Sequence, residues 1–402
     1  MLLNLNEFLT SVSFALDFVE MDILGMTSNH GKRTAYISIK IAEQLNFGTD
    51  ELKDISALAI LHDNGISYSG LGDDLSNMDS QNLDMFEKNK WHCIVGEKNI
   101  ITYPFNTNVT NVIKYHHEKY DGTGFFKLKG NEIPLMSQII ALADRIESRF
   151  DIKNNELNMQ KDILSFAESK KEKDFSSKIV DAFLRVTENK KFWEDLKNPC
   201  INTVLRESLP DNTLDLTFNQ IHEITKVFSE IIDSKSRYTR RHSKDLSIKA
   251  GIMADFYKYK PEEKMKLIIA ADLHDIGKLA VPNTILDSPN KLSDGEFQVV
   301  KKHPYYTRVV LEQIKGFEEI TNWAANHHEK LNGMGYPYGL TAKDLDFNSR
   351  LMGCLDIYEA LTEERPYRKS LSHKEAMDIL YDMSHNGFVD ESITKDIDKA
   401  LI

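Results

Sequence analysis

Apolar residues recur at helical spacing through much of this chain. Between Leu216 and Ile232 they fall mostly three or four residues apart, which is typical of an amphipathic helix. Shorter stripes with the same period run through 37–45, 52–61, 264–273 and 297–314. Strict alternation of apolar and polar residues, which would indicate strands, is weak throughout the chain. The pattern therefore predicts an all-α protein.

The breaks between these stripes divide the chain. Proline and glycine concentrate in 282–295 and 333–339, which we expect to be loops. A stretch of prolines and turn-forming residues, 198–215, precedes the longest stripe. We place a boundary there and predict domains at 1–205 and 206–402. Because no low-complexity linker separates them, we expect the domains to pack together.

The two halves repeat one pattern of histidines and acidic residues. Each half contains an isolated His, a His-Asp pair, a second isolated His, a His-His pair and an Asp, in that order. In the first half these are His30, His62, Asp63, His92, His116, His117 and Asp144, and in the second they are His242, His274, Asp275, His303, His327, His328 and Asp356. Matching positions lie 211 or 212 residues apart, which indicates two copies of one fold.

Composition and charge argue against several classes of protein. The chain has 402 residues, of which 41% are apolar, but no apolar run is long enough to span a membrane. Its first helical stripe contains Glu7, Asp17 and Glu20 and opens without a basic cluster, which argues against a signal peptide. The net charge of −12 argues against binding of a nucleic-acid polymer.

The cysteines give no disulfide framework. There are three, far apart in the sequence, which suggests a reducing compartment and a cytoplasmic protein. Cys93 directly follows His92, but it has no CxxC partner. We therefore interpret Cys93 as a buried structural thiol.

The repeated residues are of the types that bind metal ions. Ten of the 13 histidines occupy the matched positions together with aspartates, which a set of unrelated structural roles does not explain. Imidazole and carboxylate ligands without thiolates suit divalent Fe, Mn, Ni or Zn better than a structural zinc cage. Adjacent ligands on a helix point about 100° apart, so the His-Asp and His-His pairs would engage two ions. Two ions roughly 3.5–4 Å apart favour phosphodiester hydrolysis.

The second half also carries motifs in the order of a known family. It contains LHDIGKLAVP, KKHP, NHHEKLNGMGYPYGL and LDIYEALTEERPYR, with Gly335, Tyr336 and Pro337 as the GYP triplet. These motifs resemble an HD-GYP domain, the bacterial branch of the HD phosphohydrolase superfamily. The resemblance implies two tandem HD-superfamily helical bundles, of which the second, at 206–402, is the catalytic HD-GYP domain that hydrolyses a cyclic dinucleotide. An HD-like unit placed directly before an HD-GYP unit is most similar to the two-domain members that linearise hybrid cyclic GMP-AMP.

The resemblance assigns a role to each motif residue of the second half. The seven repeated residues would bind two divalent ions, with Asp275 as the bridge. Lys278, one turn beyond His274 on the same helix, would face a substrate phosphate and act in catalysis together with Asp275. Further substrate contacts would come from Asn332, Gly335, Tyr336, Pro337, Arg365 and Arg368. For the two arginines, the alternative is a helix-boundary turn with solvated side chains.

The second half departs from the family pattern at several positions. Asn332 stands where the family usually has Asp, and Met334 replaces a small polar residue, which would shift the base preference. Asp245 replaces a common arginine, and Glu359 replaces an aspartate. Tyr238 stands where three-metal members carry Glu, which favours two metal ions.

The first half keeps the ligand set but has lost the residues on the substrate side. Ile66 occupies the lysine position, Phe125 and Phe126 replace the tyrosine and proline, and nothing like RPYR follows Glu147. We interpret 1–205 as a degenerate HD-GYP-like domain with a possible metal site and a regulatory or scaffold role. Catalysis on a smaller phosphate ester and an inert relic are the alternatives.

The predicted function is a metal-dependent phosphodiesterase of bacterial second-messenger signalling. It would convert hybrid 3′,3′-cyclic GMP-AMP, cyclic di-GMP or both to a linear 5′-phosphorylated dinucleotide. A cyclic-dinucleotide receptor without turnover and an HD-superfamily nucleotidase stay open. Lys278 and the intact ligand set favour catalysis over a receptor, and the GYP loop and the RPYR segment argue against a nucleotidase. We expect no membrane partner, and a homodimer is among the oligomeric states left open.

Overall fold

The computed structural model divides the chain into two compact units. It describes residues 1–24, 29–66, 90–154, 156–198, 200–236, 241–288, 290–363 and 370–401. One unit comprises Asn4–Leu214, and the other comprises Met1–Leu3 and Asp215–Ile402. The predicted boundary at residue 205 falls inside helix α11 (Cys200–Ser208), and the structure divides the chain after Leu214 instead.

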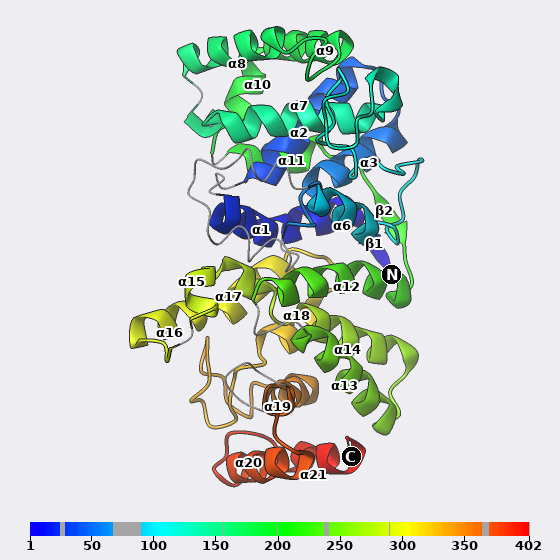
Figure 1. The fold of residues 1–402 in the computed structure, drawn as a ribbon. Coiled ribbons are helices and arrows are strands. Elements are labelled where there is room, and N and C mark those ends of the chain that lie inside the picture. Colours follow the sequence, from blue (N-terminus) through cyan, green and yellow to red (C-terminus); the bar gives the residue numbers. More distant parts are fainter. Residues whose placement is uncertain are drawn as a thin grey trace. The chain divides into compact units, whose positions relative to one another are not determined.

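The N-terminal unit consists almost entirely of helices in the part of the chain that the structure describes (Figure 1). Helix α2, which begins at His30, packs against both α3 and α7. Asp144 lies in α7, and His62 and Asp63 come shortly after the end of α3. The described helices before α11 are α1 (Leu5–Leu24), α2 (His30–Gln44), α3 (Thr49–Ile60), α6 (Trp91–Asn99), η1 (Gly130–Glu132), α7 (Leu135–Arg149), η2 (Ile152–Asn154), α8 (Leu157–Ser169), α9 (Ser177–Thr187) and α10 (Lys190–Asp195).

The C-terminal unit is likewise helical (Figure 1). Helix α14 packs against α12, α13 and α18, and the short 3₁₀ helix η3 packs against α17. Its described helices are α12 (Phe218–Ser234), α13 (His242–Phe256), α14 (Pro261–Leu273), η3 (Ile276–Ala280), α15 (Asn283–Leu286), α16 (Asp294–Val300), α17 (His303–Leu311), α18 (Glu318–Ala325), α19 (Phe347–Thr362), α20 (His373–His385) and α21 (Glu391–Ala400).

Strand structure is minor among the described residues. The strands β1 (Leu2–Asn4) and β2 (Thr213–Asp215) pair as a two-stranded sheet, and other bridges are isolated. The prediction of an all-α fold is therefore confirmed.

The apolar period located several of the described helices but missed one break. Helix α12 coincides with the stripe that begins at Leu216. The Thr217 hydroxyl caps its first turn by accepting a hydrogen bond from Gln220 N. The stripe at 297–314, in contrast, is not one helix, because α16 ends at Val300 and α17 begins at His303. Pro304 lies in the first turn of α17, where proline is tolerated, whereas a continuous helix would have to lose a hydrogen bond there.

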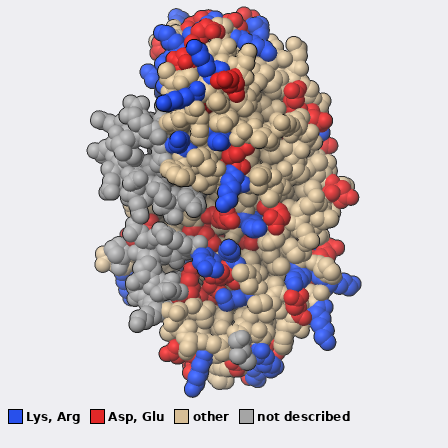
Figure 2. Space-filling model, turned by 45° about the vertical axis from the view of Figure 1, so that its right-hand side comes forward, with Lys and Arg blue, Asp and Glu red and all other residues tan. Residues whose placement is uncertain are grey.

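Charges are mixed on the molecular face shown in Figure 2. Lysine, arginine, aspartate and glutamate side chains are interspersed there among the described residues. That face therefore offers no broad positive field to a nucleic-acid polymer. Among the described helices, none combines the length and the apolar character that a membrane span requires.

Candidate metal centres

The seven predicted ligands of the C-terminal unit come together in one buried cluster, most of them from helix ends. His242 begins α13, His303 begins α17, and Asp356 lies within α19. We expected the adjacent pairs to lie inside helices, but they do not. Helix α14 ends at Leu273, before His274, and α18 ends at Ala325, before His327. The cluster comprises His242, His274, Asp275, His303, His327, His328 and Asp356.

Asp275 lies between two groups of histidines. Its Oδ2 atom is 3.2 Å from His274 Nε2 and 3.9 Å from His242 Nε2. Its Oδ1 atom is 3.2 Å from His303 Nε2 and 3.7 Å from His327 Nε2. Each oxygen therefore faces a different pair of imidazoles, which is the arrangement that a bridging carboxylate requires.

Asp356 closes the cluster on the other side. Its Oδ1 atom accepts a hydrogen bond of 3.0 Å from His242 Nε2 and lies 3.8 Å from His274 Nε2. Its Oδ2 atom lies 3.7 Å from His328 Nδ1. Asp356 thus joins the first histidine group to His328, which has a side chain that is 26% exposed.

Backbone carbonyls orient three of these imidazoles. The Nδ1 atoms of His274, His303 and His327 each donate to the carbonyl three residues earlier, at 2.8, 2.8 and 2.6 Å. This bond leaves each Nε2 with its lone pair, and the distances above direct Nε2 toward the carboxylates. Metal-ligating histidines are typically oriented by a second hydrogen bond of this kind.

The donor set fits divalent metal ions. Ligand atoms lie within 4.8 Å of one another in three buried or half-buried groups. These groups are His303, His327 and His328; His242, His274 and Asp356; and His274, Asp275 and His327. His274 Nε2 and Asp275 Oδ1 are buried without a hydrogen-bond partner among the described residues, which is costly unless an ion binds them.

The electrostatics favour the ligating form of three imidazoles and of the bridging carboxylate. His242 differs, because its hydrogen bonds to Asp356 and Glu363 outweigh burial and raise its pKa to about 10. Burial lowers the pKa of His303 and, further, that of His327, and it lowers the pKa of His328 to about 3. Burial alone would raise the pKa of Asp275, but His274 and Lys278 outweigh it and hold that pKa well below its usual range. Three imidazoles are therefore neutral and the carboxylate is ionised near neutral pH, as metal ligands must be.

We expected Lys278 to lie on the same helix as His274, but it does not. It lies in η3, which is separate from α14 and packs closely on α17, since a Cβ atom at Gly277 would overlap the His303 backbone. The Lys278 ammonium contacts Asp275 Oδ2, and its side chain is 20% exposed. The lysine therefore stands at the edge of the cluster with access to solvent.

The GYP loop lies against the same cluster. The Tyr336 ring is centred 4.7 Å from the His328 ring, and the Tyr336–Pro337 peptide is cis. Gly335 is required by close packing, because a Cβ atom would overlap the backbone of Glu329 and Lys330. This loop gives the exposed side of the metal cluster an aromatic wall.

Asn332 is exposed, and its amide oxygen accepts from Met334 N at 3.1 Å. The structure therefore uses the Asn332 oxygen to shape the loop. Tyr238, Arg365 and Arg368 lie outside the described residues, so their predicted roles stay predictions.

Sequence reasoning missed the carboxylate that holds the GYP loop. Glu329 accepts from Tyr338 N at 2.7 Å and from Leu340 N at 2.8 Å. In the N-terminal unit Glu118 does the same for Phe126 N and Leu128 N, both at 2.7 Å. The repeated HHE triplet in both halves was the available signal.

Sequence reasoning also missed an ion pair of the C-terminal unit. Asp245 stands at the position of Arg33, so another residue must pair with the buried glutamate. In the N-terminal unit Arg33 binds the buried Glu147, which also contacts His30 Nδ1. In the C-terminal unit the buried Glu359 forms its ion pair with Lys249, one turn further along α13. Glu363 Oε2 lies 3.7 Å from His242 Nδ1 and so takes over the contact to the first histidine.

The N-terminal unit assembles the matching cluster. Asp63 Oδ2 lies 3.3 Å from His62 Nε2, and Asp63 Oδ1 lies 3.6 Å from His116 Nε2 and 3.9 Å from His92 Nε2. Asp144 Oδ1 lies 3.4 Å from His30 Nε2, and Asp144 Oδ2 lies 3.9 Å from His117 Nδ1. The bridging arrangement of the carboxylate is thus repeated in the N-terminal unit.

The surroundings of the N-terminal cluster differ. Ile66, at the lysine position, is buried, and the Phe125 ring lies 6.1 Å from the His117 ring. A cavity beside His116 and His117 has a volume of only about 10 Å³. Among the described residues this cavity has room for about one water molecule.

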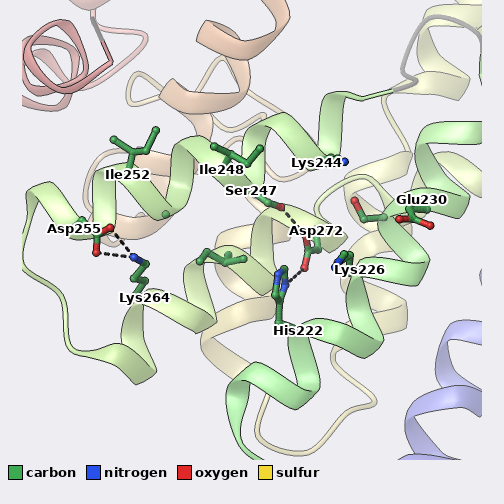
Figure 3. Close-up of a pocket in the computed structure, with 13 residues that line it drawn as sticks. His222, Lys226, Glu230, Lys244, Ser247, Ile248, Ile252, Asp255, Lys264 and Asp272 are labelled. Atoms are coloured by element: carbon green, nitrogen blue, oxygen red, sulfur yellow. Dashed lines mark hydrogen bonds and ion pairs between the residues drawn. The ribbon is translucent and has the colours of Figure 1, made fainter. Parts of the chain in front are cut away.

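A larger cavity of the C-terminal unit lies apart from the ligands. It has a volume of about 400 Å³ and is lined by α12, α13 and α14 (Figure 3). His222 and Ser247 point toward Asp272, with distances of 2.7 and 2.6 Å to its two carboxylate oxygens, and Lys264 pairs with Asp255 (Figure 3). Many of its polar groups thus bond to one another, and none of the predicted metal ligands lines it. We therefore do not place the active site in this cavity.

Comparison with known proteins gives relatives that match nearly the whole chain. A "3′3′-cGAMP-specific phosphodiesterase 1" of Vibrio cholerae is 27% identical over 387 residues, covering 94% of this chain and 87% of the relative. A "3′3′-cGAMP-specific phosphodiesterase 3" of the same organism is 28% identical, covering 99% and 94%. A crystal structure of a cyclic GMP-AMP specific phosphodiesterase of V. cholerae (V-cGAP3) superposes with a TM-score of 0.68 at 26% identity, covering 100% of this chain and 98% of that one.

Part of the chain also matches a relative with a different named substrate. A cyclic di-GMP phosphodiesterase of Pseudomonas aeruginosa is 36% identical over 134 residues, which is 33% of this chain and 32% of that protein. The model of the HD domain family matches both halves, at 19–160 and 226–393. These two segments contain every ligand of both clusters, and together they span well over half of the chain. The chain therefore belongs to the HD domain family.

Proposed function

We propose that this chain is a metal-dependent phosphodiesterase that hydrolyses a 3′,5′-cyclic dinucleotide in its C-terminal unit. The observation that carries the proposal is the position of Asp275, whose two oxygens face separate histidine groups while Lys278 contacts the same carboxylate. This combination suits a pair of divalent ions with a cation beside them. Phosphoryl transfer needs these elements, because its transition state spreads negative charge over several oxygens.

The cluster would hold two ions, drawn from Fe, Mn, Ni and Zn. His242, His274 and Asp356 suit one ion, His303, His327 and His328 suit the other, and Asp275 faces both groups. When bound, such ions act as Lewis acids on phosphoryl oxygens and lower the pKa of water. Lys278 adds a fixed positive charge at the solvent-facing edge, where the scissile phosphate would bind.

The GYP loop would bind a nucleobase of the substrate. The Tyr336 ring lies against His328, and Lys301 Nζ lies 5.3 Å from the centre of the same ring. An aromatic wall beside a cation suits a nucleobase followed by its phosphate, because every base can stack on an aromatic ring. The RPYR arginines, Arg365 and Arg368, would bind the second phosphate.

The substrate would be hybrid 3′,3′-cyclic GMP-AMP, with cyclic di-GMP as a second substrate, and the product a linear 5′-phosphorylated dinucleotide. In support, relatives that match nearly the whole chain are named for 3′3′-cGAMP, whereas the cyclic di-GMP relative matches a third of it. The Asn332 amide, unlike a carboxylate, both donates and accepts, so it would tolerate adenine. Rates on both substrates, for the parent and for Asn332→Asp, test this preference. A cyclic di-GMP preference in the parent would contradict the substrate, and an unchanged ratio in the variant would contradict the role of Asn332.

The N-terminal unit would not hydrolyse the dinucleotide. In support, it has Ile66 at the lysine position, and Phe125 and Phe126 replace the tyrosine and proline of the GYP loop. A regulatory or scaffold role for this degenerate unit is consistent with its intact set of buried ligands.

A pair of matched double variants tests the assignment of the two halves. His274→Ala with Asp275→Ala should abolish hydrolysis, because the bridge between both ligand groups is lost. His62→Ala with Asp63→Ala should retain substantial activity, measured by chromatographic separation of the linear product. Equal turnover by the first variant and the parent would place the active site elsewhere. Loss of turnover in the second variant, with its helical circular dichroism intact, would contradict the assignment of the halves.

A further inference from the structure

The N-terminal cluster contains a thiol that its C-terminal counterpart lacks. Cys93 lies in the first turn of α6, with its Sγ atom 3.3 Å from His92 Nε2. The ligand atoms of Cys93, His92, His116 and His117 all lie within 4.8 Å of one another. Cys93, which we interpreted from the sequence as a structural thiol, is thus fully buried among three imidazoles.

Unpartnered imidazole nitrogens point to a ligand at this place. His116 Nε2 and His117 Nε2 are buried and have no hydrogen-bond partner among the described residues. His116 is fully buried, and the His117 side chain is 9% exposed. The His116 Nδ1 atom donates to the Ile113 carbonyl at 2.5 Å, so its Nε2 keeps the lone pair. A buried acceptor without a partner is costly, and a metal ion would satisfy both nitrogens.

The spacing of sulfur and nitrogen is that of a zinc site. With Zn–S of about 2.3 Å and Zn–N of about 2.0–2.1 Å, tetrahedral geometry separates sulfur from nitrogen by about 3.5 Å. The observed distance from Cys93 Sγ to His92 Nε2 is 3.3 Å. The cluster therefore needs little rearrangement to close around one ion.

The matching place in the C-terminal unit has no sulfur. There the corresponding group is His303, His327 and His328, and the residue that follows His303 is Pro304. Proline has neither a side-chain donor nor an acceptor. The thiol is therefore a property of the N-terminal cluster alone within this repeat.

We propose that the Cys93 thiolate, together with His92, His116 and His117, binds a zinc-type divalent ion in the N-terminal unit. A thiolate favours Zn²⁺ over harder ions such as Mn²⁺, whereas the nitrogen and oxygen donors of the C-terminal cluster accept both. These four protein ligands, with Asp63 Oδ1 as a further neighbour 3.6 Å from His116 Nε2, leave no open tetrahedral position, which is typical of a structural site. One chain would thus carry two metal sites of different preference. This inference goes beyond the proposed hydrolysis and does not depend on it.

Cobalt substitution tests the thiolate directly, without an activity assay. The full chain is stripped with a chelator and titrated with Co²⁺, which gives a near-ultraviolet charge-transfer band only when sulfur is a ligand. The parent should show this band, and added Zn²⁺ should remove it. Cys93→Ser should bind Co²⁺ without the band, while the visible absorption of Co²⁺ at the C-terminal cluster remains.

Matched controls assign the band to one residue. Cys354→Ser removes another buried thiol, and Cys200→Ser removes an exposed one, so both should keep the band. His303→Ala, in the C-terminal cluster, should also keep it. If Cys93→Ser fails to fold, as judged by circular dichroism, Cys93→Ala replaces it in the same titration. Absence of the band in the parent, or its survival in the Cys93 variant, would overturn the proposal and leave Cys93 as a hydrogen-bonded structural thiol.

Discussion

Lys278 Nζ contacts Oδ2 of Asp275, the same carboxylate oxygen that lies 3.2 Å from His274 Nε2. The lysine thus meets the metal cluster at its bridging residue. Its counterpart in the N-terminal unit is Ile66, which is buried and carries no charge. Lys278 is thus a charged group that only the C-terminal cluster has at this position, so its removal tests which cluster can react.

Lys278→Ile, which copies the N-terminal residue, should lower turnover about 10²–10³-fold, the usual effect of losing a group that stabilises charge in the transition state. Metal content should stay at the parent level, because seven ligands remain. Turnover and bound metal are measured on the same preparation. Lys226→Ile removes a lysine from the separate cavity in Figure 3 and should change neither. A parallel loss of metal and turnover would show that Lys278 serves the ligands instead of the substrate.

Gly335→Ala should displace the GYP loop. A Cβ atom there would overlap backbone atoms of Glu329 and Lys330, which cannot move as a flexible side chain can. Since a misplacement of about 1 Å can lower rates about 10²-fold, we expect kcat/KM to fall by that order. The matched control is Gly295→Ala, whose new Cβ atom meets nothing within 4 Å and should leave kcat/KM unchanged. Equal kinetics of the two variants would show that the loop does not position the substrate.

Periodicity and repetition explain how much could be predicted. The stripe that became α12 is uninterrupted, so the helix was predicted nearly to its ends. The ligand clusters were predicted because ten histidines share one frame in both halves, and each set does come together. The break between α16 and α17 was not predicted because the apolar spacing resumes beyond Lys301 and Lys302, so only Pro304 gave a local signal.

The ion pair between Lys249 and Glu359 could not be predicted. It joins α13 to α19, and no spacing along the chain indicates which lysine on one helix reaches a carboxylate on another. Cys93 escaped for a similar reason. Its sequence neighbours contain one histidine, and His116 and His117 join it only through the fold.

Lys249→Met should destabilise the C-terminal unit. Glu359 is 2% exposed, and without Lys249 its buried charge loses its partner, which typically costs about 3 kcal/mol of unfolding free energy. Chemical denaturation measures the change. Adding Glu359→Gln removes the stranded charge and should recover much of the loss. Lys264→Met, whose partner Asp255 is 67% exposed, should cost less than about 1 kcal/mol. Equal losses in both single variants would contradict the role assigned to burial.

The last prediction concerns pH. Burial alone would lower the pKa of His222, but the hydrogen bond and the charge of Asp272 outweigh it and raise that pKa above its usual value. Asp272 is 2% exposed and also accepts from Thr225 and Ser247, so it joins α12, α13 and α14. Since the folded pKa exceeds the unfolded value of about 6.5, protonated His222 favours the folded state. This contribution is complete below pH about 6.5 and is lost as the pH rises through the raised pKa.

His222→Gln keeps a donor toward Asp272 but does not titrate, so it isolates this effect. Between about pH 6 and about pH 8, the melting temperature of the parent should fall more steeply than that of the variant. Thermal melts are recorded by circular dichroism in the presence of a chelator, so that metal release does not contribute. His385→Gln is the control, because His385 lies at the end of α20, away from Asp272, and should retain the parent slope. Identical slopes for the parent and His222→Gln would show that His222 does not change its protonation between the folded and unfolded states.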